Sequence, residues 1–113
     1  MKVLNIDEVE GEKLGNTEAI RKTLVYSENI MLMYTEAMPG GPPLSHSHPH
    51  EQIGFVIQGT SELTASGKTV TLRAGSSFLL EPNEHHEIRG IGEEKVKVLD
   101  IFHPYREDYI SQK

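Results

Sequence analysis

The sequence predicts an all-β fold, an antiparallel sandwich or barrel, from three observations. Short runs rich in β-branched and aromatic residues recur along most of the chain. Glycine, proline, asparagine and serine separate these runs at close and regular intervals. The pattern contains no long amphipathic helix, internal repeat or low-complexity tract. Short strands joined by tight turns are typical of antiparallel sheets that pack together or close on themselves.

The first predicted strand covers residues 29–38. Residues 7–22 are assigned no regular structure, because the charged stretch 8–13 follows neither the helical nor the strand period. The proline- and glycine-rich segment 39–43 ends the strand, since proline cannot donate to a ladder. We therefore expect a loop to carry His46 into place.

The rest of the chain predicts a hairpin meander. Glycines at 59, 67 and 75 mark tight turns, and a loop is expected around Pro82. The predicted strands are residues 52–58, 60–65, 68–72, 77–80, 85–89 and 95–102. Neighbouring runs this close in sequence are expected to pair as antiparallel strands.

Length and composition predict one domain over residues 1–113. A chain of 113 residues buries roughly 65% of its unfolded surface when it folds as a single unit. The hydrophobic fraction of 36% and the charged fraction of 25% suggest neither disorder nor a membrane protein. No apolar run approaches the length of a membrane span.

Charge and cysteine content exclude several kinds of chemistry. The formal net charge is −6 and no cluster of lysine or arginine is present, so nucleic acid is not expected as a partner. An anionic substrate would need a local cation. The absence of cysteine rules out disulfides and thiolate ligands. The N-terminal residues lack a basic region followed by an apolar stretch, so we expect a cytoplasmic protein with no membrane partner.

A group of histidines has the spacing of a metal site. His46, His48 and Gln52 share parity, so on a strand their side chains would point to one face. His86 follows Gln52 by thirty-four positions. Imidazole nitrogen suits zinc, nickel, copper and iron, whereas an amide oxygen suits harder ions, so this set does not name its metal.

The spacing resembles the two motifs of the cupin family. The first motif, within residues 40–59, is matched by Gly40, His46, His48, Gln52 and Gly59, with glutamine in place of the usual glutamate. The second, within residues 75–90, is matched by Gly75, Pro82, Asn83 and His86, with Glu81 where proline is common. The resemblance implies a single cupin domain, a conical antiparallel β-barrel of the jelly-roll (double-stranded β-helix) type. It also implies one divalent transition metal (Ni, Zn, Fe or Mn) held by His46, His48, Gln52 and His86.

The C-terminal segment 98–110 narrows the resemblance. It contains Asp100, Phe102, Pro104, Arg106, Glu107, Asp108 and Tyr109, and is similar to the ending of small pectin-degradation cupins that open unsaturated uronate rings. Residues 46–56, with the glutamine ligand, and Leu14-Gly15-Asn16 extend the likeness over almost the whole chain. The sequence departs from that family at Glu81, at Glu84-His85 and at Pro42-Pro43, positions that bear on the substrate rather than the fold.

This likeness implies metal-dependent conversion of 4,5-unsaturated monouronates, released by pectin or alginate lyases, into linear ketonised uronates. Asp100 is expected as the general acid/base, because strand parity places it with Val98 and Phe102 on the interior face, where a carboxylate is costly unless it is paired or functional. Arg106 would clamp the substrate carboxylate and Phe102 would wall the pocket. A neutral Gln52 would leave the metal its full +2 charge.

Simpler roles remain open for several of these residues. Asp100 could be a structural carboxylate, and Arg106 could pair with Glu107 or Asp108 on the surface. His50 and His85 are expected to support the site rather than bind the metal, with His85 the alternative to His86 if the turn slips by one residue. Tyr26, Tyr34 and Phe55 are expected in the core.

Two other functions fit the same sequence. One is a cupin dioxygenase or lyase that acts on another small molecule, and the other is a non-catalytic cupin that binds a sugar or other small ligand. A homodimer is expected by likeness to small cupins, and the N-terminal residues could supply an exchanged edge strand.

Overall fold

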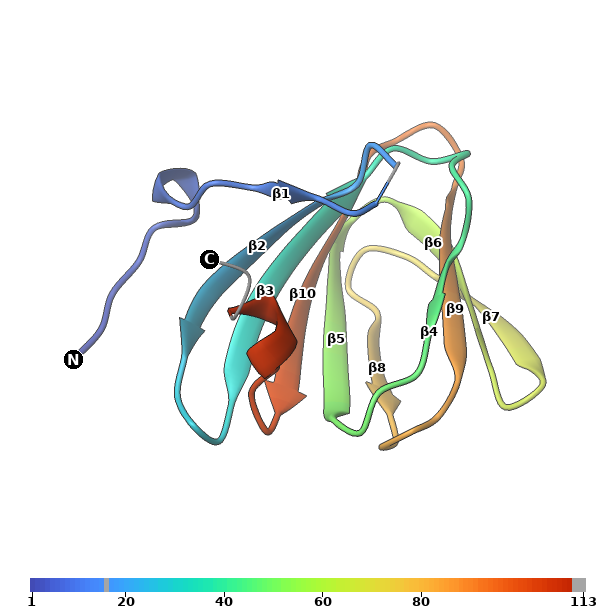
Figure 1. The fold of residues 1–113 in the computed structure, drawn as a ribbon. Coiled ribbons are helices and arrows are strands. Elements are labelled where there is room, and N and C mark those ends of the chain that lie inside the picture. The colour runs from blue at the N-terminus through green and yellow to red at the C-terminus, as the bar shows by residue number, and fades with distance from the viewer. Residues whose placement is uncertain (16, 111–113) are drawn as a thin grey trace.

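The computed structural model describes residues 1–15 and 17–110, without the side chains of His46 and Tyr109. The elements are η1 (Ile6–Glu8), β1 (Glu12–Lys13), β2 (Ile20–Tyr26), β3 (Met31–Ala37), β4 (Leu44–His46), β5 (Glu51–Gln58), β6 (Thr60–Ala65), β7 (Lys68–Leu72), β8 (Ser77–Leu80), β9 (His86–Ile91), β10 (Val96–His103) and η2 (Glu107–Tyr109). The strands form a six-stranded sheet, β1-β2-β3-β10-β5-β8, and a four-stranded sheet, β4-β9-β6-β7 (Figure 1).

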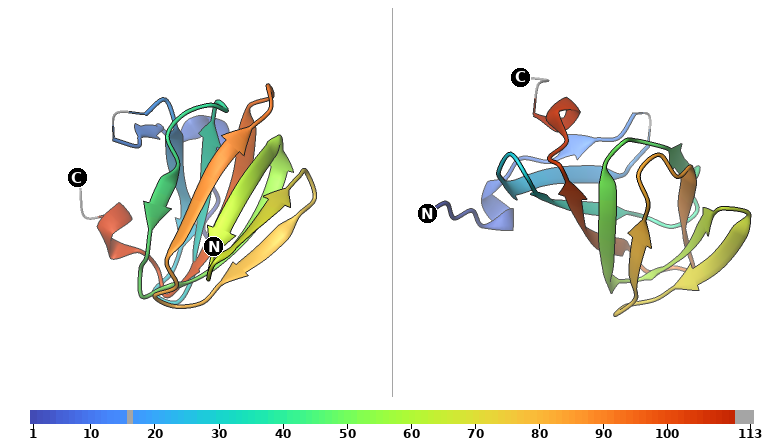
Figure 2. Two further views of the ribbon diagram at one scale, coloured as in Figure 1. Left: turned by 90° about the vertical axis from the view of Figure 1, so that its right-hand side faces the viewer. Right: turned by 90° about the horizontal axis from the view of Figure 1, so that it is seen from below.

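Every strand pair is antiparallel, which confirms the all-β prediction. The final strand, β10, lies between β3 and β5 in the middle of the larger sheet. It pairs on one side with a strand near the start of the chain and on the other with one from its centre. In both views of Figure 2, the short turn η2 lies outside the two sheets.

Several boundaries from the sequence were correct and others were wrong. Strands β6, β7 and β8 have the predicted limits, while β3, β5, β9 and β10 differ from prediction by one or two residues at one or both ends. Strand β2 was missed, because its run of charged and polar residues hides any alternation. Residues 6–8 and 12–13 also form short elements within or beside the segment that was assigned no structure.

His46, His48 and Gln52 do not share one strand, so strand parity alone does not bring their side chains together. His46 is the last residue of β4 rather than part of a loop, and Gln52 lies near the start of β5. His48 lies between the two strands, where Pro49 interrupts any ladder. The three positions therefore approach one another from a strand end, a bend and a strand start.

The core lies between the sheets. Its larger cluster consists of Val56, Leu63, Leu72, Leu80, Val96 and Val98. A smaller cluster of Met31, Met33 and Phe102 is packed against Tyr105 and Ile110.

Three aromatic residues were expected in this core. Tyr34 is buried, whereas Tyr26 and Phe55 are exposed. Phe55 occupies an outward position of β5, and the Tyr26 ring stacks on Tyr105 with centroids 6.0 Å apart. No helix in the described part of the chain is long and apolar enough to cross a membrane.

Candidate metal centre and substrate cavity

Three of the four predicted metal ligands meet at one end of the space between the sheets. His46 and His86 are directly opposite each other in the β4–β9 ladder, and Gln52 is opposite Phe102 in the β5–β10 ladder. The rings of His48 and His86 lie 5.3 Å apart between centroids. His48, Gln52 and His86 are all buried. The side chain of His46 lies outside the described part of the structure, so its role as a ligand stays a prediction.

Backbone carbonyls orient both described imidazoles. The Nδ1 atom of His48 lies 3.0 Å from the carbonyl oxygen of His50, and Nδ1 of His86 lies 3.0 Å from that of Glu84. A carbonyl can only accept, so each Nδ1 carries the proton. In the neutral ring the lone pair is then on Nε2. This arrangement is usual for histidines that bind a metal through Nε2.

Gln52 connects the imidazoles to Asp100. Its Nε2 donates to Asp100 Oδ1 at 2.8 Å, which turns its Oε1 toward His48 Nε2, 3.0 Å away. Burial and the nearby Arg106 guanidinium lower the pKa of His48, which favours the neutral ring. Two electron-pair donors then face each other, and a cation between them would satisfy both. The donor set of imidazole nitrogens and an amide oxygen therefore fits a divalent metal.

No three described His, Cys, Asp or Glu side chains converge into a metal-sized group. The third described ligand of the predicted set is an amide, and the fourth is the undescribed His46 side chain. The neighbouring His85 is exposed, with Nε2 3.0 Å from Ser45 Oγ. His86 is thus the one of the pair that faces the interior.

Asp100 lies on the interior face of β10, as strand parity predicted. Val98, Asp100 and Phe102 are buried, while Ile101 and His103 between and beyond them are exposed. Burial raises the pKa of the Asp100 carboxyl from 3.8 to about 6, and the hydrogen bond from Gln52 partly opposes this rise. A carboxyl group with such a pKa can both donate and accept a proton near neutral pH.

Phe102 separates the imidazoles from Arg106. Its ring lies 5.5 Å from the His48 ring, and the Arg106 guanidinium carbon lies 5.2 Å from its centroid. Arg106 donates from Nε and Nη2 to the two carboxylate oxygens of Asp108, at 2.9 and 2.7 Å. The ion pair that the sequence allowed with Asp108 is therefore present. Arg106 itself, however, is buried rather than on the surface.

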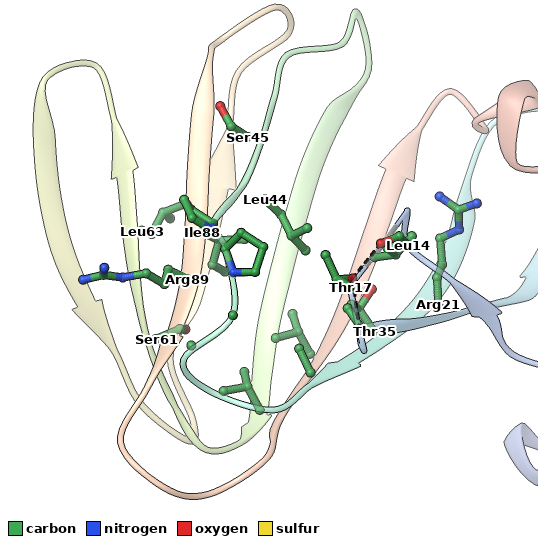
Figure 3. Close-up of a pocket in the computed structure, with 18 of the residues that line it drawn as sticks. Leu14, Thr17, Arg21, Thr35, Leu44, Ser45, Ser61, Leu63, Ile88 and Arg89 are labelled. Carbon is green, nitrogen blue, oxygen red and sulfur yellow. Dashed lines mark hydrogen bonds between the residues drawn. The ribbon is translucent and has the colours of Figure 1, made fainter.

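A cavity of about 740 Å³ extends from this centre between the two sheets. Gln52, His86, Asp100 and Phe102 line the end of the cavity at the predicted metal ligands, whereas Arg106 is not among the described residues that line it. In Figure 3 one wall carries Ser61, Leu63 and Ile88, and the other carries Arg21 and Thr35. Arg21 could not be selected from the sequence, because its strand β2 was not recognised.

Comparison with known proteins places this chain in a family. The cupin domain profile matches residues 33–102. The chain belongs to the cupin family. The cupin is 30% identical over 105 residues to the pectin degradation protein KdgF of Dickeya dadantii, with 92% of this chain and 94% of that protein covered. It is also 34% identical over 67 residues to the H2HPP isomerase of Bacillus subtilis, of which it covers 28%.

Solved structures agree with this assignment. The structure of KdgF from Halomonas sp. superposes on the cupin with a TM-score of 0.86 and 25% identity, with 96% of this chain and 99% of that one covered. An RmlC-like cupin from Shewanella frigidimarina gives a TM-score of 0.84 at 25% identity, with 94% and 93% covered. The expected cupin fold and the resemblance to the pectin-degradation proteins are confirmed.

Proposed function

We propose that this cupin is an enzyme that converts 4,5-unsaturated monouronates into linear ketonised uronates. The observation that carries the proposal is the chain of contacts from His48 through Gln52 to the buried Asp100. It joins a candidate metal ligand to a candidate proton donor inside one cavity. The relatives named as pectin degradation proteins support a small sugar acid as the substrate.

Ring opening of such a substrate requires only two kinds of functional group in the site. The sugar is a cyclic hemiacetal whose ring oxygen is attached to a C=C bond. Opening the ring yields an aldehyde and an enol, and the enol must then gain a proton on carbon. A group that transfers protons and a group that stabilises negative oxygen are therefore sufficient.

His46, His48, Gln52 and His86 would hold the metal. Cupins commonly bind a divalent metal ion, and nickel, zinc, iron and manganese are all compatible with this donor set. Such an ion would supply Lewis-acid stabilisation of a negatively charged substrate oxygen. Because all four ligands are neutral, they leave the charge of the ion undiminished.

Asp100 would act as the general acid/base. Its pKa of about 6 lets the carboxyl protonate and deprotonate within one catalytic cycle near neutral pH. The amide of Gln52 fixes Oδ1, so we expect Oδ2 to exchange the proton with the substrate. Phe102 would form the wall beside the reacting carbon.

The substrate carboxylate requires a cation. The sequence assigns this role to Arg106, whose guanidinium can hold a carboxylate in a bidentate fork. In the structure this fork holds Asp108. The substrate carboxylate would therefore have to displace the Asp108 carboxylate from the Arg106 guanidinium.

A homodimer is part of the proposal. The outer face of the six-stranded sheet exposes five apolar side chains, at 39–53% relative accessibility. They are Ile53, Phe55, Ile57, Leu79 and Ile101. The ladders place Ile53 beside both Ile101 and Leu79, so the group is continuous. A contiguous exposed apolar area of this kind marks an interaction surface.

The deciding assay uses the purified metal-loaded protein and the unsaturated monouronate. The absorbance of the conjugated C=C bond should disappear much faster than by spontaneous ring opening. A rate equal to the spontaneous one would rule the activity out. Oxygen uptake measured in the same mixture separates an isomerase, which consumes none, from a cupin dioxygenase.

A further inference from the structure

Arg21 projects from β2 on the cavity side of the six-stranded sheet. The ladders align it with Thr35 on β3, and Thr35 with Val98 on β10. All three residues line the cavity. The Arg21 side chain is only 12% exposed. The guanidinium therefore lies largely out of water on the inner face of the sheet.

Residues that are directly opposite one another on neighbouring strands form rows across the sheet. These rows give the position of Arg21 along the cavity, counted from the metal centre. Gln52 and Phe102 form the row at the metal centre, and Asp100 lies in the next row with Met33. Arg21 lies in the third row, two strands from β10. Its backbone is therefore displaced from Asp100 by roughly 10 Å across the sheet and roughly 7 Å along it.

The direction of the side chain shortens only the separation along the strands. In Figure 3 the Arg21 side chain extends from β2 along the barrel, toward the end at which Ser45, the neighbour of His46, is drawn on the opposite wall. An arginine side chain together with one sugar ring can span the remaining distance to Asp100. A substrate that meets Asp100 with its reacting carbon would thus bring its carboxylate toward Arg21.

The other charged groups of the cavity wall favour this assignment. Arg89 also contributes to the wall, but its guanidinium donates to Glu62 at 2.7 Å and its side chain is 53% exposed. Arg21 contacts Glu12 through one nitrogen at 3.4 Å. A guanidinium presents five N–H donors in a fork that matches the geometry of a carboxylate.

A second polar group faces the same cavity. Ser61, on the opposite sheet, is fully buried, and its hydroxyl has no hydrogen-bond partner among the described residues. A buried hydroxyl that lines a cavity is a ready contact for a polar ligand. The inner half of the cavity therefore offers a cation and a hydroxyl to a sugar acid.

We propose that Arg21, rather than Arg106, binds the carboxylate of the sugar acid within the cavity; this inference rests on the proposed function. The carboxylate is attached directly to the C=C bond, so holding it also positions the carbon that must be protonated. Arg21 is thus a substrate-binding residue that sets the preference for acidic over neutral sugars.

The test compares Arg21→Gln, Arg21→Lys and the control Arg89→Gln in the metal-loaded protein. KM for the unsaturated monouronate and the dissociation constant for saturated glucuronate should both rise about 10- to 100-fold in Arg21→Gln. Arg21→Lys should recover part of this loss, and Arg89→Gln should match the wild type. Binding of glucose should be weak in every protein, and unchanged metal content with a native melting transition should confirm folding.

The outcomes separate this inference from the proposed function. Turnover by the wild type with an unchanged KM in both Arg21 variants would overturn the role of Arg21 and leave the activity standing. No turnover by the wild type would overturn the activity, while loss of glucuronate binding in the Arg21 variants would still support the anion site. Equal glucuronate affinity in all proteins would refute that site in either case.

Discussion

At the scale of single residues, the proposed acid/base Asp100 carries a cost in stability. Its folded pKa of about 6 lies above its ordinary 3.8, so burial penalises the ionised form by up to about 3 kcal/mol. As pH falls through 6, the folded carboxyl takes up a proton before the unfolded one does, and this penalty disappears. The buried Asp100 carboxylate is therefore destabilising at neutral pH.

Replacing Asp100 by asparagine should remove this cost and the activity together. In metal-free protein at pH 7.5, Asp100→Asn should be more stable than the wild type by about 1 to 3 kcal/mol. The advantage should shrink below pH 6 and vanish near pH 4. Urea denaturation across this pH range measures it, and turnover by the variant should be undetectable. An equally pH-dependent stability in both proteins would contradict the buried charge.

The two neighbouring histidines of the second motif give a matched pair for the metal site. His86→Ala removes a buried ring held by the Glu84 carbonyl, whereas His85→Ala removes an exposed one bonded to Ser45. Elemental analysis should find much less than one equivalent of bound metal in His86→Ala and a wild-type amount in His85→Ala. The reverse result would move the ligand by one residue. His48→Ala should behave as His86→Ala does.

At the scale of elements, the packing of the Phe78 ring over β5, beside Asp100, depends on Gly54. This glycine of β5 is opposite both Asp100 on β10 and Phe78 on β8. A methyl group at Gly54 would overlap the Phe78 ring, which is part of the packed interior. The position requires a small residue for packing, because its φ angle is an ordinary one for a strand.

Gly54→Ala should therefore destabilise the protein. We expect a loss of about 1 to 3 kcal/mol from overpacking. Gly41→Ala is the matched control, since nothing lies within 4 Å of its added methyl group and its φ angle is not positive. Chemical denaturation of both variants measures the difference. Equal stability of the two would mean that Phe78 can move aside at no cost.

The way in which the strands are connected and paired also explains which of them could be predicted from the sequence. Strands β6, β7 and β8 follow one another through tight turns, so local residue patterns mark their limits. Strand β2 escaped detection because polar Arg21 and Thr23 take the inner positions that apolar residues usually fill. The spacing of His48, Gln52 and His86 indicated the candidate metal centre. The position of Arg21 in the cavity wall depends on the pairing of β2 with β3, which residue patterns did not reveal. The ion pair of Arg106 with Asp108 was one of two alternatives that the sequence left open.

At the scale of the whole molecule, the outer face of the six-stranded sheet should pair two copies. Phe55→Glu would place a charge in the middle of the exposed apolar group, while Val70→Glu would place one on β7 of the other sheet. Light scattering after size exclusion should give a dimer for the wild type and for Val70→Glu, and a monomer for Phe55→Glu. A monomeric wild type would refute the homodimer.

The central place of β10 also governs the order in which the protein can be made. During synthesis, β3 and β5 leave the ribosome long before β10, so each has one unpaired edge until residues near 103 emerge. Such waiting edges are open to pairing with other chains. Asp100 lies on this same strand, so the sheet and the candidate site are completed at the same time. A nascent chain that stops before β10 has neither.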